Sequence, residues 1–185
     1  MKEEFHFRGS GGQGILLMGL VLAHAGMREG LHVSWIPSYG AERRGGPSFC
    51  AVTVSDKPVD CPVTDEPTLL FAMDPRAARA YAPKLKRGAE LVLNTSLVTE
   101  PPKGSFHCQG VEANRLASEA GLAAAANMAA LGAVLAVKPV VSIASVAEAL
   151  PAALGARKSH LAAGNLKVLE AGFKSARPCS VAFKP

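Results

Sequence analysis

The chain has 185 residues, of which 49% are hydrophobic and 19% charged, and its formal net charge is +5. This length predicts one domain over residues 1–185, and the low charged fraction excludes a mainly disordered chain. Lys and Arg are dispersed and aromatic residues make up only 5%, so the composition argues against nucleic-acid binding and for an anionic small molecule or an acidic protein face as partner.

The first half of the chain alternates between strand and helix patterns, with glycine and proline at the boundaries. In chain order we predict a strand at 5–8, a glycine turn at 9–14, an apolar helix at 15–25, strands at 31–36 and 49–54 around a loop at 37–47, a strand at 69–73, a helix capped by Asp74 and Pro75 that runs to 81, and a strand at 89–93. Asn94, Thr95 and Ser96 follow the last of these strands.

The second half is mainly helical and rich in alanine. We predict a strand at 105–108, helices at 112–120, 126–137, 145–150 and 159–173, and a last stretch at 177–185 that frays or pairs with a neighbouring strand. Residues 120–137 carry no formal charge, but alanine contributes little transfer energy, so we expect a buried helix and no membrane span. The order of elements predicts an α/β fold, a Rossmann-like three-layer sandwich with a mixed, mostly parallel sheet and a helical C-terminal part.

Cysteine and histidine are not spaced for a metal or a cluster. The four cysteines contain no C-x-x-C pair, and the five histidines contain no H-x₃-H or H-E-x-x-H spacing. We therefore expect no metal on this chain and no iron–sulfur cluster. The first five residues carry acids in place of the basic and then apolar run of a signal peptide, which favours a cytoplasmic protein with reduced thiols.

The glycine turn is the first candidate site. Gly9, Gly11 and Gly14 fit G-x-G-x-x-G between a strand and a helix, where free backbone N–H groups attract a phosphate or carboxylate. A tight turn that only packs is the alternative. A dinucleotide enzyme places an acid at the end of its second strand, but residues 35–38 read Trp-Ile-Pro-Ser. The sequence therefore disfavours NAD and leaves a phosphate-bearing ligand or a partner's backbone as occupant.

The second candidate site is the loop at 38–46. Arg43 and Arg44 are suited to planar, bidentate recognition of a carboxylate or phosphate, and Glu42 could orient one of them. A solvated basic loop is the alternative. No Ser, Cys or Lys is visibly paired with a His or an acid, so we expect no catalytic residue, and Cys50 beside Phe49 is expected in the core.

Three ordered motifs resemble the gamma subunit of 2-oxoacid:ferredoxin oxidoreductases, a resemblance that runs from Phe5 to Phe173. They are Gly-Ser-Gly-Gly-Gln-Gly-Ile-Leu-Leu at 9–17, Pro-Ser-Tyr-Gly-Ala-Glu-Arg-Arg-Gly-Gly at 37–46 and Asn-Met-Ala-Ala-Leu-Gly-Ala at 127–133. The stretch at 85–94 and the late helix with Asn165 add to it. Arg43 departs from the family's usual Met. The small subunit of indolepyruvate oxidoreductase is the second choice, because it typically carries a His-Gly loop where this chain has Ser38-Tyr39-Gly40.

The resemblance implies a multisubunit enzyme that decarboxylates a 2-oxoacid (pyruvate, ketoisovalerate or 2-oxoglutarate), passes electrons to ferredoxin and transfers the acyl group to coenzyme A. Thiamine diphosphate, Mg and iron–sulfur clusters would belong mainly to alpha, beta and delta-type partners, and ferredoxin would be reached through the complex. A standalone Rossmann-like nucleotide-binding protein is the further alternative.

Under this resemblance the two candidate stretches serve either subunit assembly or the coenzyme A path, and two asparagines belong to the motifs. The expected ligand or interface residues are Gly9, Gly11, Gly12, Gln13, Gly14, Ser38, Tyr39, Glu42, Arg43, Arg44, Gly45 and Gly46, with Asn94 and Asn127 as further motif positions.

Overall fold

The computed structural model describes residues 1–39, 45–61 and 65–179. Its strands are β1 (Lys2–Ser10), β2 (His32–Tyr39), β3 (Pro47–Ser55), β4 (Leu69–Ala72), β5 (Glu90–Asn94), β6 (His107–Val111) and β7 (Arg177–Pro178). Its α-helices are α1 (Ile15–Arg28), α2 (Pro75–Tyr81), α3 (Ala113–Glu119), α4 (Ala126–Val137), α5 (Ile143–Leu154) and α6 (Ala162–Ser175). Short 3₁₀ turns at Ala82–Lys84, Ala123–Ala125 and Ser159–Leu161 join some of these elements.

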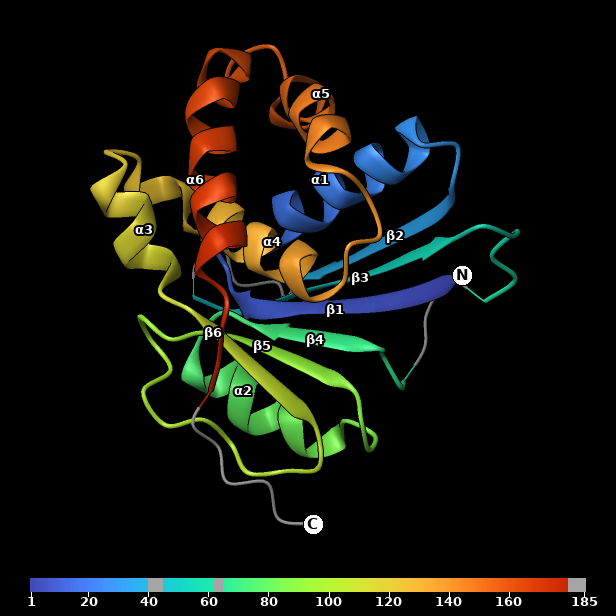
Figure 1. Ribbon diagram of the computed structural model, residues 1–185, viewed down its shortest axis with the longest axis vertical. Coiled ribbons are helices and arrows are strands. Elements are labelled where there is room, and N and C mark those ends of the chain that lie inside the picture. The colour runs from blue at the N-terminus through green and yellow to red at the C-terminus, as the bar shows by residue number, and fades with distance from the viewer. Residues whose placement is uncertain (40–44, 62–64, 180–185) are drawn as a thin grey trace.

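The strands form one mixed sheet in the order β2-β3-β1-β4-β5-β6-β7 (Figure 1). β1 pairs in parallel with β4 on one side and antiparallel with β3 on the other. The parallel ladder continues through β5 and β6, and β7 closes the edge antiparallel to β6. β1 and β4 therefore lie next to each other at the middle of the sheet. After β1 the chain continues to β2 at one edge, whereas after β4 it continues to β5 in the opposite direction.

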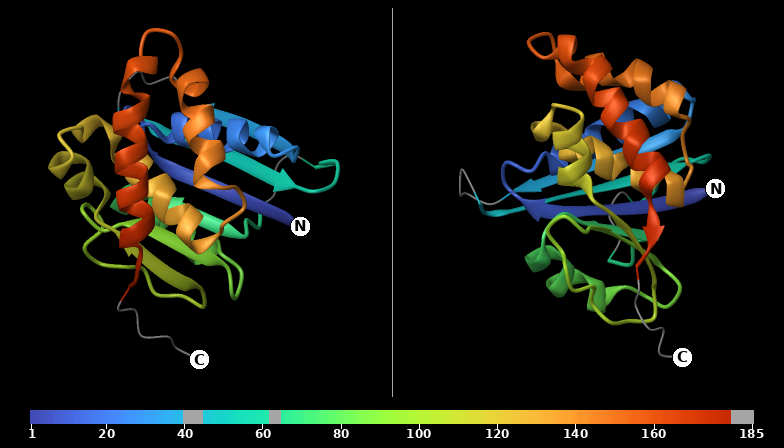
Figure 2. Two further views of the ribbon diagram at one scale, coloured as in Figure 1. Left: turned by 45° about the horizontal axis from the view of Figure 1, so that its top comes forward. Right: turned by 60° about the vertical axis from the view of Figure 1, so that its left-hand side comes forward.

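Helices cover the two faces of the sheet unequally (Figure 2). α1, α3, α4, α5 and α6 lie on one face and bury the larger core, to which Phe5, Phe7 and Phe71 contribute. Of the α-helices in the described ranges, only α2 lies on the other face, over β4–β6, where it buries a smaller core with Leu70, Leu91 and Phe106. Because neighbouring side chains alternate along a strand, the residues between Phe5 and Phe7, and Arg8 after them, face the side of α2.

The predicted fold class is confirmed, since a mixed seven-stranded sheet with helices on both faces is an α/β sandwich. The predicted helix at 126–137 matches α4, and Asp74 caps α2 with Pro75 at its first position as expected. Within the described residues, no helix is both long and apolar enough to cross a membrane.

Two boundaries of the predicted loop at 37–47 are wrong. Pro37 pairs with Cys50 inside β2, and Pro47 is the first residue of β3. Both positions suit proline, because β2 is the edge strand of the sheet and a first strand residue need not donate to the ladder. The strand expected at 105–108 lies instead at His107–Val111, and the helix expected at 145–150 extends over Ile143–Leu154.

Helices α4 and α6 approach so closely that their contact depends on two glycines. A Cβ atom at Gly132 would overlap the carbonyl oxygen of Leu169, and one at Gly172 would overlap that of Ala129. Backbone atoms cannot yield as the end of a flexible side chain can, so the two helices have to separate to accept even a methyl group.

We predict that Gly172→Ala lowers the free energy of unfolding by about 1–3 kcal/mol, the usual cost of overpacking. Gly164→Ala, on the same helix, is the matched control. The nearest atom there is a methyl carbon of Leu122 at 3.3 Å. We expect the free energy of unfolding of that control to stay unchanged or to rise by up to about 1 kcal/mol, because alanine has a better helix propensity than glycine. Urea denaturation of the two variants measures both values, and equal stabilities would refute the close helix contact.

Candidate functional site

The glycine turn between β1 and α1 is closed by its own glutamine. The Ser10 backbone N–H donates to Oε1 of Gln13 at 2.6 Å, and the Gln13 N–H donates to the Ser10 carbonyl at 3.1 Å. A Cβ atom on Gly9 would lie 2.5 Å from Gln13 Oε1 and 2.9 Å from the Cβ of Met73. Gly9 therefore has no room for a side chain, and Gln13 holds the turn from inside.

The start of α1 packs against α4 through another glycine. Gly14 has a positive φ of 76°, and a Cβ atom there would lie 2.6 Å from the amide nitrogen of Asn127. Asn127 is buried and donates from Nδ2 to the Gly14 carbonyl at 3.1 Å. The first turn of α1 carries no acid, and Gly14 caps it without a side-chain hydrogen bond. The free N–H groups there keep their attraction for an anion.

Three polar side chains join the ends of β1 and β4 beside this turn. Ser10 Oγ donates to Asp74 Oδ2 at 2.6 Å, while Asp74 Oδ1 accepts the Ala77 N–H at 2.9 Å and so caps α2. Arg76 then donates from Nη2 to Ser10 Oγ at 3.1 Å. The carboxyl edge between β1 and β4 is thus fixed by a continuous chain of hydrogen bonds.

The second candidate stretch returns to the glycine turn. The Gly11 N–H donates to the Gly46 carbonyl at 2.8 Å, and Arg76 Nη2 donates to the Gly45 carbonyl at 3.0 Å. Ser38 lies in β2 and is exposed. The two stretches predicted to form a site therefore meet. The positions Glu42, Arg43 and Arg44 and the side chain of Tyr39 lie outside the described part of the chain.

A pocket of about 500 Å³, which we call the switch pocket, opens beside this edge. Its lining includes Arg8, Ser38, Ser48, Phe49, Arg76 and Tyr81. It lies at the carboxyl ends of the neighbouring strands β1 and β4. The connections after these two strands lead to opposite sides of the sheet, so this is a topological switch point. Open α/β sheets bind ligands at such points.

Arg8 gives the switch pocket a partly buried positive charge. Its guanidinium carbon lies 3.8 Å from the ring centroid of Phe49, its partner residue in β3, and 3.5 Å from that of Tyr81. Burial lowers the pKa of Arg8, but a guanidinium stays charged at any physiological pH. Nε of Arg8 is buried and has no hydrogen-bond partner among the described residues. The contacts with the rings therefore hold the cation in place without neutralising it.

Neither guanidinium group of the pocket forms a direct ion pair with a carboxylate of the described residues. The nearest acid in the hydrogen-bond chain is Asp74, which Ser10 Oγ bridges to Arg76. Arg76 satisfies its donors with a hydroxyl and a carbonyl oxygen instead. Two guanidinium groups without a direct ion pair among the described residues favour an anion in the pocket.

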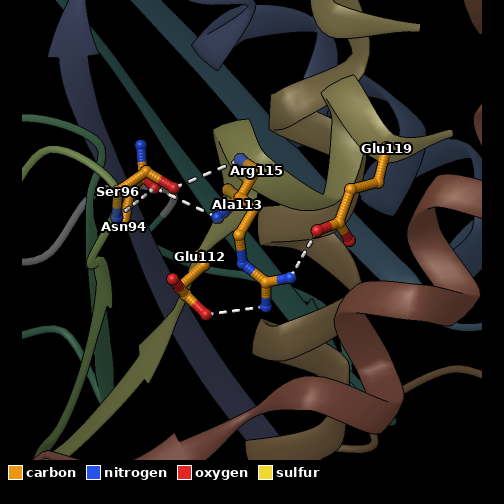
Figure 3. A network of polar contacts seen from close by, with 6 residues as sticks. All are labelled: Asn94, Ser96, Glu112, Ala113, Arg115 and Glu119. Carbon is orange, nitrogen blue, oxygen red and sulfur yellow. Dashed lines mark hydrogen bonds and ion pairs between the residues drawn. The ribbon is translucent and has the colours of Figure 1, made fainter. Parts of the chain in front are cut away.

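Asn94 is fully buried and makes hydrogen bonds that hold the fold together (Figure 3). Its Oδ1 accepts the Ala113 N–H at 3.2 Å and the Ser96 N–H at 3.3 Å. Its Nδ2 donates to Asn114 Oδ1 at 2.7 Å. The same corner holds Arg115, whose guanidinium pairs with Glu112 and Glu119. Asn94 thus ties the end of β5 to the start of α3.

Sequence reasoning missed Arg8 and Arg76 as site residues. Arg8 carries a weak signal, because it follows the buried Phe5 and Phe7 at the opposite phase of the same strand. Arg76 sits one residue inside a helix that starts at the end of a strand, a position that aims side chains at the sheet edge. Neither signal identifies the aromatic rings or loop carbonyls that surround these arginines, since those come from other elements.

The geometry at the pocket suits binding of an anion. Cys50 is buried, its thiol donates to the Ile15 carbonyl, and burial raises its pKa to about 12. Over the described ranges, no group of three or more His, Cys, Asp or Glu side chains is placed to hold a metal ion. Backbone N–H groups and guanidinium groups are therefore the chemistry that this edge presents.

Comparison with known proteins gives consistent relatives. Residues 4–175 match the family model described as pyruvate ferredoxin/flavodoxin oxidoreductase. Ketoisovalerate oxidoreductase subunit VorA of Methanothermobacter marburgensis is 37% identical over 91% of this chain. The chain spans only 35% of the length of that relative. The 2-oxoglutarate synthase subunit KorC of Methanothermobacter thermautotrophicus is 35% identical, with 81% of this chain and 84% of KorC covered.

A solved structure supports the same relationship. The gamma subunit of a keto/oxoacid ferredoxin oxidoreductase from Geobacter sulfurreducens superposes with a TM-score of 0.80 at 29% identity. The match covers 96% of this chain and 99% of that subunit. The comparisons support the first of the two resemblances that the motifs suggested.

We predict that Ser10 and Asp74 are energetically coupled. Asp74→Ala should lower the free energy of unfolding by about 1–2 kcal/mol, since it removes the cap of α2, and Ser10→Ala should cost about 1 kcal/mol. The double variant should fall short of the sum by about 0.5 kcal/mol or more. Urea denaturation measures the cycle. A parallel cycle with Ser10 and the distant Ser159 should be additive, and additivity in both cycles would contradict the contact.

Proposed function

Because this chain belongs to the pyruvate ferredoxin/flavodoxin oxidoreductase family, we propose that it is the gamma-type component of a 2-oxoacid:ferredoxin oxidoreductase. Such an enzyme decarboxylates a 2-oxoacid, passes the electrons to ferredoxin and transfers the acyl group to coenzyme A. Residues 1–185 form one gamma-type domain in this proposal. The substrate class is a 2-oxoacid such as ketoisovalerate, 2-oxoglutarate or pyruvate.

The redox groups belong to companion chains in this proposal. Protein sites for Mg²⁺ use carboxylate ligands, and iron–sulfur clusters need thiolate or imidazole ligands. The described residues bring no three such side chains together, so this part of the chain does not fit a metal or a cluster, and we derive no step through one. Alpha, beta and delta-type subunits would carry these groups, and ferredoxin would dock on the complex.

The contribution of this chain is to receive the phosphates of coenzyme A at the switch pocket. The observation that supports this most directly is the pair of guanidinium groups, Arg8 and Arg76, which line one pocket of about 500 Å³ without a carboxylate partner among the described residues. The free N–H groups of α1 start from the adjacent glycine turn. Two cations in one pocket suit a polyphosphate better than a single carboxylate.

Each of the two arginines has a separate task in this proposal. Arg8 is held by Phe49 and Tyr81, so its charge is preorganised and little side-chain entropy is lost on binding. Arg76 is tied to Ser10 and to the Gly45 carbonyl, so it also links the pocket to the loop that follows β2. A subunit interface with an acidic partner face uses the same charges and is the alternative that the experiment has to separate.

We predict that Arg76→Ala raises the KM for coenzyme A about ten- to hundredfold in the assembled complex, since a charge-assisted hydrogen bond contributes about 1.5–3 kcal/mol. The KM for the 2-oxoacid should stay unchanged. Arg87→Ala is the matched control, because Arg87 is exposed and precedes the amino end of β5, at the opposite edge of the sheet.

Steady-state kinetics and analytical size-exclusion of the complex are measured on the same preparations. An intact complex with an unchanged KM for coenzyme A would refute the coenzyme A site. Loss of assembly with an unchanged KM in the surviving complex would assign Arg76 to an interface and would also refute it.

A further inference from the structure

Two of the four cysteines face each other at the far edge of the sheet. Gln109 pairs with Pro178 across β6 and β7, so Cys108 and Cys179 come next in register, and the Cys179 N–H donates to the Cys108 carbonyl at 2.9 Å. Residues opposite each other on antiparallel strands have Cα atoms about 4.5–5.5 Å apart, which lies within the roughly 4.4–6.8 Å that a disulfide spans. Their side chains point to the same face of the sheet.

The two cysteines also belong to one core. Cys179 packs against the smaller core that contains Cys108. The absence of a side chain at Gly110 makes room here, because a Cβ atom there would lie 3.3 Å from the sulfur of Cys179. Both cysteines are reduced in the structure. Nothing in the fold would need to move far for a bond between the two sulfurs.

Cys179, the less buried of the two cysteines, also lines a second pocket. This pocket, of about 430 Å³, is lined by Cys179 together with Thr95, Glu112, Arg115 and Arg177. Arg115 is neutralised by Glu112 and Glu119, whereas the Arg177 guanidinium donates only to the carbonyls of Lys174 and Ala176 among the described residues. A guanidinium that keeps its charge next to an accessible sulfur attracts an anionic reagent.

We propose that Cys108 and Cys179 form a thiol–disulfide exchange site that reacts with anionic low-molecular-weight disulfides and closes to a reversible bridge between β6 and the C-terminal segment. Cys179 is the attacking thiol, because it is partly exposed whereas Cys108 is buried. The neighbouring Cys108 thiol lowers the pKa of Cys179, and the interaction with Cys179 together with burial raises the pKa of Cys108. The exposed thiol is thus the better nucleophile and the buried one resolves.

The exchange balances in two steps. The Cys179 thiolate attacks one sulfur of the incoming disulfide, a mixed disulfide forms, the original sulfur–sulfur bond breaks, and the released thiolate takes up the proton that Cys179 lost. Cys108 then loses its proton and attacks the sulfur of Cys179. The second small thiol leaves with that proton. Two protein thiols are oxidised to one disulfide, and one small disulfide is reduced to two thiols.

The test uses the full chain with Cys61→Ser, which removes the exposed thiol that would otherwise react on its own. The protein is equilibrated with glutathione at increasing ratios of disulfide to thiol, quenched with acid, alkylated and analysed by peptide mass spectrometry. We expect Cys108 and Cys179 to lose alkylation together and to appear as one linked peptide pair. Cys50 should stay a thiol throughout as the internal control. Independent loss of the two thiols, or no loss, would overturn the bridge.

Two variants separate the roles of the two thiols. Cys108→Ala should accumulate one glutathione per chain on Cys179, since no resolving thiol is left. Cys179→Ala should leave Cys108 unmodified. If glutathione instead collects on Cys108 in the second variant, the assignment of the attacking thiol is wrong.

A third variant tests the anionic pocket. Arg177→Ala should slow the reaction with glutathione disulfide several-fold and leave the rate with the neutral hydroxyethyl disulfide unchanged. The neutral reagent reports whether the variant has disturbed the thiols themselves. Equal slowing with both reagents, or none with either, would remove the anion preference from the proposal.

Discussion

The close approach of backbone and side chains at the glycine turn is the constraint on which the rest of the site depends. Gly9 leaves room for Gln13 and Met73, and Gly14 leaves room for Asn127. These contacts join β1, the end of β4 and helix α4, which lie far apart in the sequence. The turn is therefore rigid before any ligand arrives, and its N–H groups are fixed in direction. Such preorganisation lowers the entropy that a bound anion has to offset.

The acidic and the basic side chains around this turn have different roles. Asp74 is the acid closest to the turn in the hydrogen-bond chain, and both of its oxygens are occupied by Ser10 and the Ala77 N–H. The arginines donate instead to uncharged oxygens or lie over aromatic rings. The acid thus stabilises the fold, while the positive charges stay available to a ligand or to a neighbouring subunit.

The sequence predicted the elements well where local patterns decide them. Apolar runs between glycine and proline marked β3, β4 and β5, and Asp74-Pro75 marked the start of α2. It failed where the environment comes from elsewhere in the chain. The sequence predicts a loop at Pro37 because proline breaks most strands, and only the edge position of β2 explains why this strand tolerates it. Arg8 was overlooked because Phe49 and Tyr81 reach it from two other elements.

The strand order also explains why the G-x-G-x-x-G spacing does not indicate a nicotinamide site here. In a dinucleotide-binding fold the second strand lies next to the first, and the acid at its end reaches the ribose. In this chain β3 is inserted between β1 and β2 and runs antiparallel to both. The neighbour of the turn is therefore the start of β3, with Pro47 opposite Ser10. An acid at the end of β2 would lie one strand further from the glycine turn than in a dinucleotide-binding fold. The difference is therefore in the strand order as well as in the residue. Among the described residues, the glycine turn therefore has no neighbouring parallel strand on the β3 side that could present a ribose contact.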